Sequence, residues 1–335
     1  MKLSVIIPLY NSGHFLSRCI GSLLNQDIDI NDYEVLIIND GSTDNSLDIA
    51  LEFANNHSNV FVHNKANGGV GSARNKGISL AKGEYIYFID PDDYLAANVL
   101  HTIISEAKNN SLDILTFLSK STTKPKLFET RTENINLQDF KITNGIDFIA
   151  SNRYQNEVWW YIIKRSFIED SGIKFIEDRW MEDAIITPQL FLNAERVAKL
   201  PIDAHRHLIV EGSAMKSKES AHYLRVIDDN RNAAMVFESL INDLKEKSAN
   251  ADCIKRLRVR QQSFVFFMMV RMLKSEISLN RVKKTMDQLS STGAYPMDSF
   301  VSVDYKGFNY VVLTKLFNNK ELFYILFKIF NPFLK

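Results

Sequence analysis

The chain has 335 residues, of which 45% are hydrophobic and 24% are charged. Its 40 Lys and Arg residues balance its 40 Asp and Glu residues, so no global field points to a nucleic-acid partner. The length and hydrophobic content predict two domains, or one domain with an appendage. The two cysteines, Cys19 and Cys253, form no Cys or Cys/His cluster, which argues against a disulfide framework or a zinc site and fits a reducing compartment.

The first hundred residues alternate between strand-like and helix-like patterns. Short apolar runs predict strands at 4–10, 34–40, 60–64 and 84–90, and amphipathic patterns predict helices at 14–26, 44–56 and 71–82. Strict alternation of this kind implies right-handed β-α-β crossovers. We therefore expect an α/β domain with a mostly parallel sheet covered by helices on both faces.

Acidic residues stand at the carboxyl ends of two of these strands, where ligands bind to parallel sheets. Asp40 ends the second strand, and "YFIDPDDYL" places Asp90, Asp92 and Asp93 directly after the fourth. A turn with a helix cap would explain a single Asp. Three acids opposite another strand-end acid favour a hard divalent cation, because carboxylate oxygens suit Mg²⁺ or Mn²⁺.

The rest of the chain has a weaker pattern. Mixed elements run to about residue 215, and long amphipathic helices are predicted at 219–247 and 252–275, with a boundary near 213–220. The segment 245–284 holds 11 basic and three acidic residues and could meet an anionic surface. The tail "LFYILFKIFNPFLK" could contact a membrane, pack on the catalytic domain or form a homodimer.

No stretch reaches the ~18 apolar residues that a spanning helix needs. The opening "KLSVIIPLY" lacks the apolar core and cleavage site of a signal peptide. We therefore expect a cytoplasmic protein, either free or peripheral on the cytoplasmic face of the membrane.

Three strings together resemble a known family. "LSVIIPLYN", "VLIINDGSTDNS" and "NGGVGSARNKGISLAKGEYIYFIDPDD" are similar, almost continuously from Leu3 to about Leu95, to the nucleotide-sugar domain of family 2 glycosyltransferases. Sparser similarity continues through "WMEDAIITPQLF". The resemblance implies a GT-A fold at 1–215, with a nucleotide-sugar-binding half at 1–112 and an acceptor-binding half at 113–215. A helical C-terminal region is expected at 216–335.

By this resemblance, Asp90-Pro91-Asp92 takes the place of the family's DxD motif. Asp92 would be the ligand of Mn²⁺ or Mg²⁺, and Asp90 would contact the ribose or a metal-bound water. Family members often carry a small residue between the two acids. Pro91 instead removes a backbone donor and fixes φ, so a backbone contact to the donor sugar would be lost there.

The resemblance also implies a nucleotide pocket. Asp40 would bind the nucleobase, which favours UDP, and Pro8 and Tyr10 would wall the base. Arg74, in "NGGVGSARN", would contact the donor. Taken singly, Asp40 could cap a turn, Tyr10 could be a packing residue, and the glycines could form a turn that leaves Arg74 solvated.

Transfer to an alcohol also needs a proton acceptor. Glu182 and Asp183 stand side by side at the start of an apolar helical stretch, and the family's catalytic base is the second acid of this pair, Asp183. Mutual repulsion and partial burial would raise its pKa. The alternative is a helix N-terminus that merely carries acids. A base opposite the leaving group implies inversion at the anomeric carbon.

Five further residues are candidates with an open alternative. His205, Arg206 and His207 could contact the diphosphate or the metal, or form part of a surface strand. Trp159 and Trp160 could offer a platform for a sugar, or belong to the core.

The sequence thus predicts a metal-dependent inverting glycosyltransferase of the hexosyl or N-acetylhexosaminyl type. It would move one sugar from a UDP-sugar to a glycan or lipid-linked acceptor in capsule, exopolysaccharide or lipopolysaccharide synthesis. Processive members use QxxRW, whereas "IEDRW" at 176–180 lacks the Gln. The alternative of another class is a non-catalytic sugar-nucleotide-binding or scaffold protein.

Overall fold

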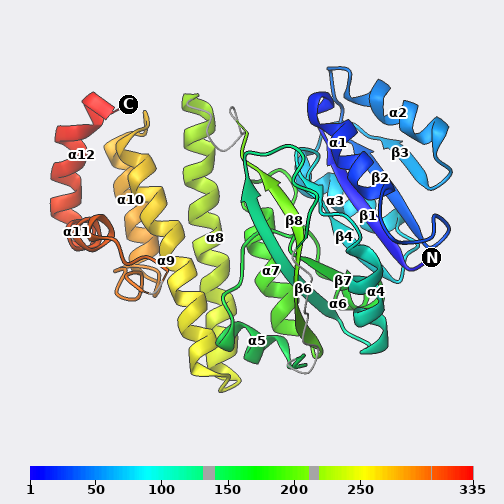
Figure 1. The fold of residues 1–335 in the computed structure, drawn as a ribbon. Helices are drawn as coiled ribbons and strands as arrows, with labels where there is room; N and C mark the ends of the chain where they lie inside the picture. Colours follow the sequence, from blue (N-terminus) through cyan, green and yellow to red (C-terminus); the bar gives the residue numbers. More distant parts are fainter. Residues whose placement is uncertain (131–139, 211–218, 303, 335) are drawn as a thin grey trace. The chain divides into compact units, whose positions relative to one another are not determined.

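The computed structural model describes residues 1–130, 140–210, 219–302 and 304–334 (Figure 1). The chain divides into two compact units, Met1–Phe148 with Arg153–Glu211, and Ile149–Asn152 with Gly212–Lys335. The predicted domain boundary at 215/216 falls in 211–218, outside the described residues.

The first part of the first unit has the predicted alternation of strands and helices. Its elements are β1 (Leu3–Leu9), α1 (Gly13–Leu24), β2 (Tyr33–Asn39), α2 (Ser46–Asn56), β3 (Val60–Asn64), α3 (Gly69–Leu80) and β4 (Tyr85–Phe88). The strands β3, β2, β1 and β4 pair in parallel. The predicted elements are confirmed, with ends within about two residues, which is the usual uncertainty of helix and strand boundaries.

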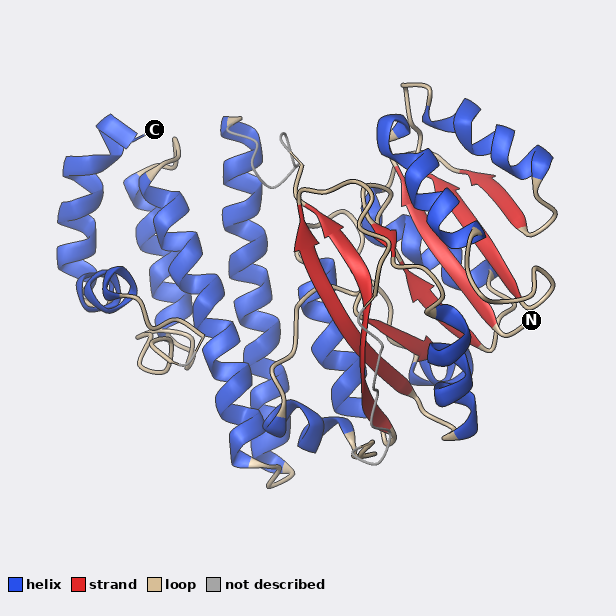
Figure 2. Ribbon diagram, in the orientation of Figure 1, coloured by secondary structure: helices blue, strands red, loops and turns tan. Residues whose placement is uncertain are grey.

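The strands that follow extend the same sheet, and further helices lie between them. They are β5 (Tyr94–Leu95), α4 (Leu100–Asn109), β6 (Ile114–Thr122), α5 (Gly145–Ser151), β7 (Tyr161–Lys164), α6 (Arg165–Ser171), α7 (Glu182–Asn193) and β8 (Val197–Leu208). The strand order is β3-β2-β1-β4-β7-β6-β8-β5, and β7 runs antiparallel to both of its neighbours. Figure 2 shows the sheet with helices on its faces.

Both faces of the central strands are covered, which explains why β1 and β2 read as unbroken apolar runs. On one face, Val5 and Ile7 of β1 join a core with residues of α1 and α4. On the other, α3 approaches so closely that a Cβ on Gly77 would lie 2.4 Å from Cγ2 of Ile6. The exception is β3, an edge strand of which only Val60 is buried.

The second unit is helical, as predicted. Its helices are α8 (Ser220–Glu246), α9 (Ala251–Leu273), α10 (Leu279–Ser290), α11 (Phe308–Phe317) and α12 (Lys320–Leu334). Aromatic rings fill its interior: Phe237 meets Phe264 edge to face, and Phe266 stacks on Phe300 at 4.4 Å. No helix among the described residues is long and apolar enough to cross a bilayer.

Candidate functional site

The turn at 90–93, named the DxD turn after the predicted motif, follows β4 and contacts α1. The N–H of Asp93 donates to the carbonyl of Asp90 over 3.1 Å, which closes the turn across Pro91. Nη2 of Arg18, on α1, donates to the carbonyl of Asp92 over 2.9 Å. Backbone contacts therefore fix the turn and leave the side chain of Asp92 out of this hydrogen bonding.

Arg74 of α3 connects this turn to the start of α7. Its guanidinium donates from Nη2 to Oδ1 of Asp90 over 2.9 Å and from Nη1 to Oε1 of Glu182 over 2.6 Å. Arg74 and Glu182 are 3% and 5% exposed. Burial acts to lower the pKa of Arg74, but the charges of Asp90 and Glu182 outweigh it and raise that pKa. Residues 108 positions apart are thereby brought to one site.

Two neighbouring acids begin α7 in a locally unusual backbone. Met181, just before them, has φ of 68°, a left-handed conformation that few residues other than Gly adopt. Burial, followed by the charge of Glu182, raises the pKa of Asp183 well above its usual value. Burial also raises the pKa of Glu182, although Arg74 acts in the opposite direction. A carboxylate of this kind is a better proton acceptor than an exposed one.

Asp92 lies close to the two other acids of the triplet. Burial, and then the charges of Asp93 and Asp90, raise its pKa to about 7. Among the described residues, no three His, Cys, Asp or Glu side chains form a group that could hold a metal. Mg²⁺ is usually held by one or two carboxylates together with substrate phosphates, so Asp92 and Asp90 fit such an ion.

Asp93 faces away from the other two acids of the triplet, toward β8. It is 1% exposed, its Oδ1 accepts from the N–H of Leu208 over 2.9 Å, and its Oδ2 contacts Nε2 of His205 over 2.9 Å. Nδ1 of His205 in turn meets the hydroxyl of Tyr87 at 2.8 Å. Burial alone would raise the pKa of Asp93, but the two histidines beside it lower that pKa to about 2. Asp93 thus ties the turn to β8, and both of its carboxylate oxygens already have partners there.

The two candidate tryptophans before β7 are both buried. Trp159, 7% exposed, stacks on the rings of His205 and His207, at 4.4 and 5.5 Å between centroids. Trp160, 4% exposed, stacks on Phe191. Both tryptophans therefore lie in the packed interior.

The three residues of "HRH" on β8 differ in exposure. Arg206 is fully buried and donates to the carbonyls of Leu127 and Glu129, away from the DxD turn, so no N–H of its guanidinium is presented to a diphosphate. His205 is fully buried as well. The side chain of His207 is 43% exposed, and its hydrogen bond to Asp93 raises its pKa. His207 is the member of this group that a ligand could reach.

Asp40, at the end of β2, holds the glycine-rich loop before α3 through hydrogen bonds. Its Oδ1 accepts from Nζ of Lys65 over 2.5 Å and from the N–H of Gly68 over 3.0 Å, while its Oδ2 accepts from the N–H of Gly69 over 2.8 Å. Gly69 has φ of 85°, which favours Gly. The loop before α3 is therefore built around this carboxylate.

The two predicted wall residues lie beside Asp40 at the end of β1. Pro8 is buried within the strand and pairs with Ile38 of β2. Tyr10, one residue beyond the strand, is 50% exposed, which leaves one side of its ring open to a ligand.

Three residues that contact the site were not predicted from the sequence: Arg18, Lys65 and Tyr87. Lys65 carried a usable signal, because it follows β3 directly and so stands at the same sheet edge as Asp40. Tyr87 looked like one more apolar strand residue, and Arg18 like a solvated residue of an amphipathic helix. Their partners lie 118 and 74 positions away, which no local pattern reveals.

The fold and the site together define a GT-A-like glycosyltransferase architecture. Staphylococcus aureus TarS 1–349 in complex with UDP superposes with a TM-score of 0.66 at 19% identity, over 99% of this chain and 92% of that one. At this identity the likeness concerns the fold alone.

Sequence comparison gives the family. The profile described as Glycosyl transferase family 2 matches residues 4–168, so this part of the chain is a domain of that family. Poly(ribitol-phosphate) beta-glucosyltransferase of Bacillus spizizenii is 34% identical over 59% of this chain and 31% of its own length. Cholesterol galactosyltransferase of Borreliella burgdorferi is 24% identical over 98% of this chain and 96% of its own. The chain covers 58% or less of the length of each curated relative that is at least 34% identical to it.

Proposed function

We propose that the protein is a metal-dependent, inverting glycosyltransferase that moves one sugar from a UDP-sugar to a hydroxyl of a glycan or lipid-linked acceptor. The observation that carries the proposal is the double ion pair of Arg74, which brings the DxD turn and the Glu182–Asp183 pair together. Family membership supports the class of reaction, because the matched domain includes Arg74 and the DxD turn.

Each group of the site has one task in this reaction. Asp183 accepts the proton of the acceptor hydroxyl as that oxygen forms its bond to the anomeric carbon and the bond from that carbon to the diphosphate breaks. Asp92 and Asp90 would hold Mn²⁺ or Mg²⁺, which would supply positive charge against the departing diphosphate. Attack opposite the leaving group inverts the anomeric centre. Arg74 holds the carboxylates of Asp90 and Glu182 in place relative to each other.

UDP is the proposed nucleotide. Support comes from TarS, whose similar fold was solved in complex with UDP, and from the position of Asp40 next to exposed Tyr10. Oδ2 of Asp40 accepts from the N–H of Gly69, and a carboxylate oxygen has two lone pairs. It can therefore accept a further hydrogen bond from the N–H of a uracil ring.

The proposed acceptor belongs to surface polysaccharide or to membrane lipid. Two relatives are named for such acceptors, poly(ribitol phosphate) and cholesterol, and the second of them aligns along 98% of this chain. A peripheral contact of the helical unit with an anionic membrane would bring the enzyme to an acceptor of this kind.

α12 supplies the surface for that contact. Ile325, Ile329 and Phe333 form one exposed stripe, with exposed fractions of 53%, 52% and 83%. The opposite side of the helix is packed, because Phe323 and Phe327 are buried. Between Leu322 and Leu334 the charged residue is Lys328, so this part of the helix is apolar and basic, as helices that lie on anionic bilayers are.

A donor screen tests the reaction. UDP-, GDP- and dTDP-sugars are compared for Mn²⁺-dependent hydrolysis and for stabilisation against heat, with EDTA as the control. UDP-sugars should give the larger response, and it should vanish in EDTA. If UDP-sugars stabilise the protein but are neither hydrolysed nor transferred to any acceptor, the non-catalytic alternative is favoured.

Vesicle sedimentation tests the membrane contact. Deleting 321–335 would strip buried Phe323 and Phe327 from the core, so a point substitution is the sharper test. Ile329→Glu should reduce sedimentation with phosphatidylglycerol vesicles several-fold. Leu51→Glu, which places the same charge at a 42% exposed leucine of α2, should not. Equal sedimentation of the two variants would count against α12.

A further inference from the structure

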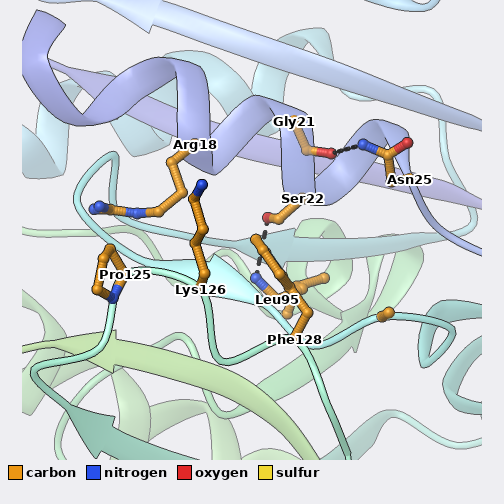
Figure 3. A pocket seen from close by; sticks show the side chains of 9 residues that line it. Arg18, Gly21, Ser22, Asn25, Leu95, Pro125, Lys126 and Phe128 are labelled. Carbon is orange, nitrogen blue, oxygen red and sulfur yellow. Dashed lines mark hydrogen bonds between the residues drawn. The ribbon is translucent and has the colours of Figure 1, made fainter.

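A cavity of about 610 Å³ lies between α1, residues 95–97 and residues 125–128 (Figure 3). Its volume is in the range of small-molecule sites. The lining residues are Arg18, Gly21, Ser22, Asn25, Leu95, Ala97, Pro125, Lys126 and Phe128. Nothing in the proposed reaction uses this space.

The charges around the cavity are of one sign. Figure 3 shows the cationic ends of Arg18 and Lys126 at the same end of it, above Pro125. Among the lining residues that the structure describes, none is acidic. Nε of Arg18 is buried and has no hydrogen-bond partner among the described residues, although Nη2 donates to the carbonyl of Asp92. The protein thus leaves the guanidinium of Arg18 with hydrogen-bonding capacity that its own acceptors do not fill.

The other end of the cavity is apolar and firmly held. Leu95 is 1% exposed, and Phe128 packs edge to face on Tyr94 at 5.3 Å. Backbone hydrogen bonds fix the wall, because the N–H of Ala97 donates to the carbonyl of Phe128 over 2.8 Å and Arg206 donates to the carbonyl of Leu127 over 3.0 Å. The cavity thus pairs a cationic end with a preformed apolar end.

We infer that this cavity binds a small organic anion with an apolar body, such as an alkyl phosphate. Its anionic group accepts from the guanidinium of Arg18 and from Nζ of Lys126, while its hydrocarbon lies against Leu95 and Phe128. The same chemistry is offered by a lipid phosphate and by a soluble organophosphate. None of the residues proposed for the donor site lines this cavity, so the two sites are distinct sets of residues.

Calorimetric titration of the full chain tests this assignment, with saturating UDP and Mn²⁺ present to occupy the donor site. The probes are hexyl phosphate, inorganic phosphate and hexyl glucoside. Hexyl phosphate should bind at least about tenfold more tightly than either of the others, because only it engages both ends of the cavity. Decyl phosphate binding more tightly than hexyl phosphate would assign the site to a lipid phosphate, and no gain with chain length to a soluble one.

Two matched variants place the binding. Lys126→Gln should weaken hexyl phosphate about fivefold and flatten its dependence on salt. Lys124→Gln makes the same change of charge two residues away, at a side chain that does not line the cavity, and should leave binding unchanged. Equal affinity of both variants for hexyl phosphate, displacement of the probe by UDP, or tighter binding of hexyl glucoside would each overturn the proposal.

Discussion

The acids at the edge of the sheet form two groups, which differ in how many donors reach each carboxylate. Asp40 and Asp93 are almost fully buried, and both oxygens of each receive donors from the backbone or from a basic side chain. Asp92 and Asp183 have few such partners, and burial with nearby like charge raises the pKa of both. The first group holds loops in place. The second contains the proposed metal ligand and the proposed base, whose raised pKa values are typical of functional sites.

Substitution of Asp183 should have the largest effect, and it falls on the second group. Asp183→Asn should lower the rate of sugar transfer by about 10²- to 10⁴-fold, because it removes the proton acceptor. UDP affinity and the free energy of unfolding should not fall, since the Asn oxygen can still accept from the N–H of Ala184. Asp170→Asn, at an exposed acid of α6, is the control for transfer assays. Full activity of Asp183→Asn would remove it from the reaction.

Arg74 links Asp90 of the DxD turn to Glu182 at the start of α7, and breaking this link should mainly affect stability. Arg74→Met leaves the buried carboxylate of Glu182 without its partner, which should lower the free energy of unfolding by about 3 kcal/mol. Urea denaturation measures the change. The double variant Arg74→Met with Glu182→Gln should recover part of the loss, because the uncompensated charge is gone. If the two substitutions are additive, the ion pair does not couple α3 to α7.

A substitution of Asp93 tests whether the first group of acids holds loops in place. In Asp93→Asn one of the two oxygens becomes an amide that donates, so either the N–H of Leu208 or His205 loses its acceptor. We expect a loss of about 1–3 kcal/mol in the free energy of unfolding. Asp48→Asn, on the exposed side of α2, should change stability little. An unchanged unfolding midpoint for Asp93→Asn would show that the turn is held to β8 by other contacts.

This division among the acids sets the limit of what the sequence could predict. The parallel half was predictable because β1 and β2 are buried on both faces and read as continuous apolar runs. The acids at 90–93 and the Glu-Asp pair could be singled out because each is a local string, and their roles in the reaction stay predictions. The string could not show that Asp93 differs from Asp92, since that difference depends on His205, 112 residues away. The packing of Trp159 on the two histidines depends on the same long-range pairing of strands.

The smallest expected effect is on the pH dependence of the reaction, and it tests the cause of the raised pKa of Asp183. A base works in its ionised form, so the rate should fall as the pH falls through this raised pKa, above the range of an ordinary carboxyl group. Glu182→Gln removes the neighbouring like charge while its amide oxygen can still accept from Arg74. The acidic limb of kcat/KM should therefore move to lower pH, with little change at the plateau. A limb that stays in place would assign the raised pKa to burial alone, and a limb that moves to higher pH would contradict the assignment of Asp183 as the base.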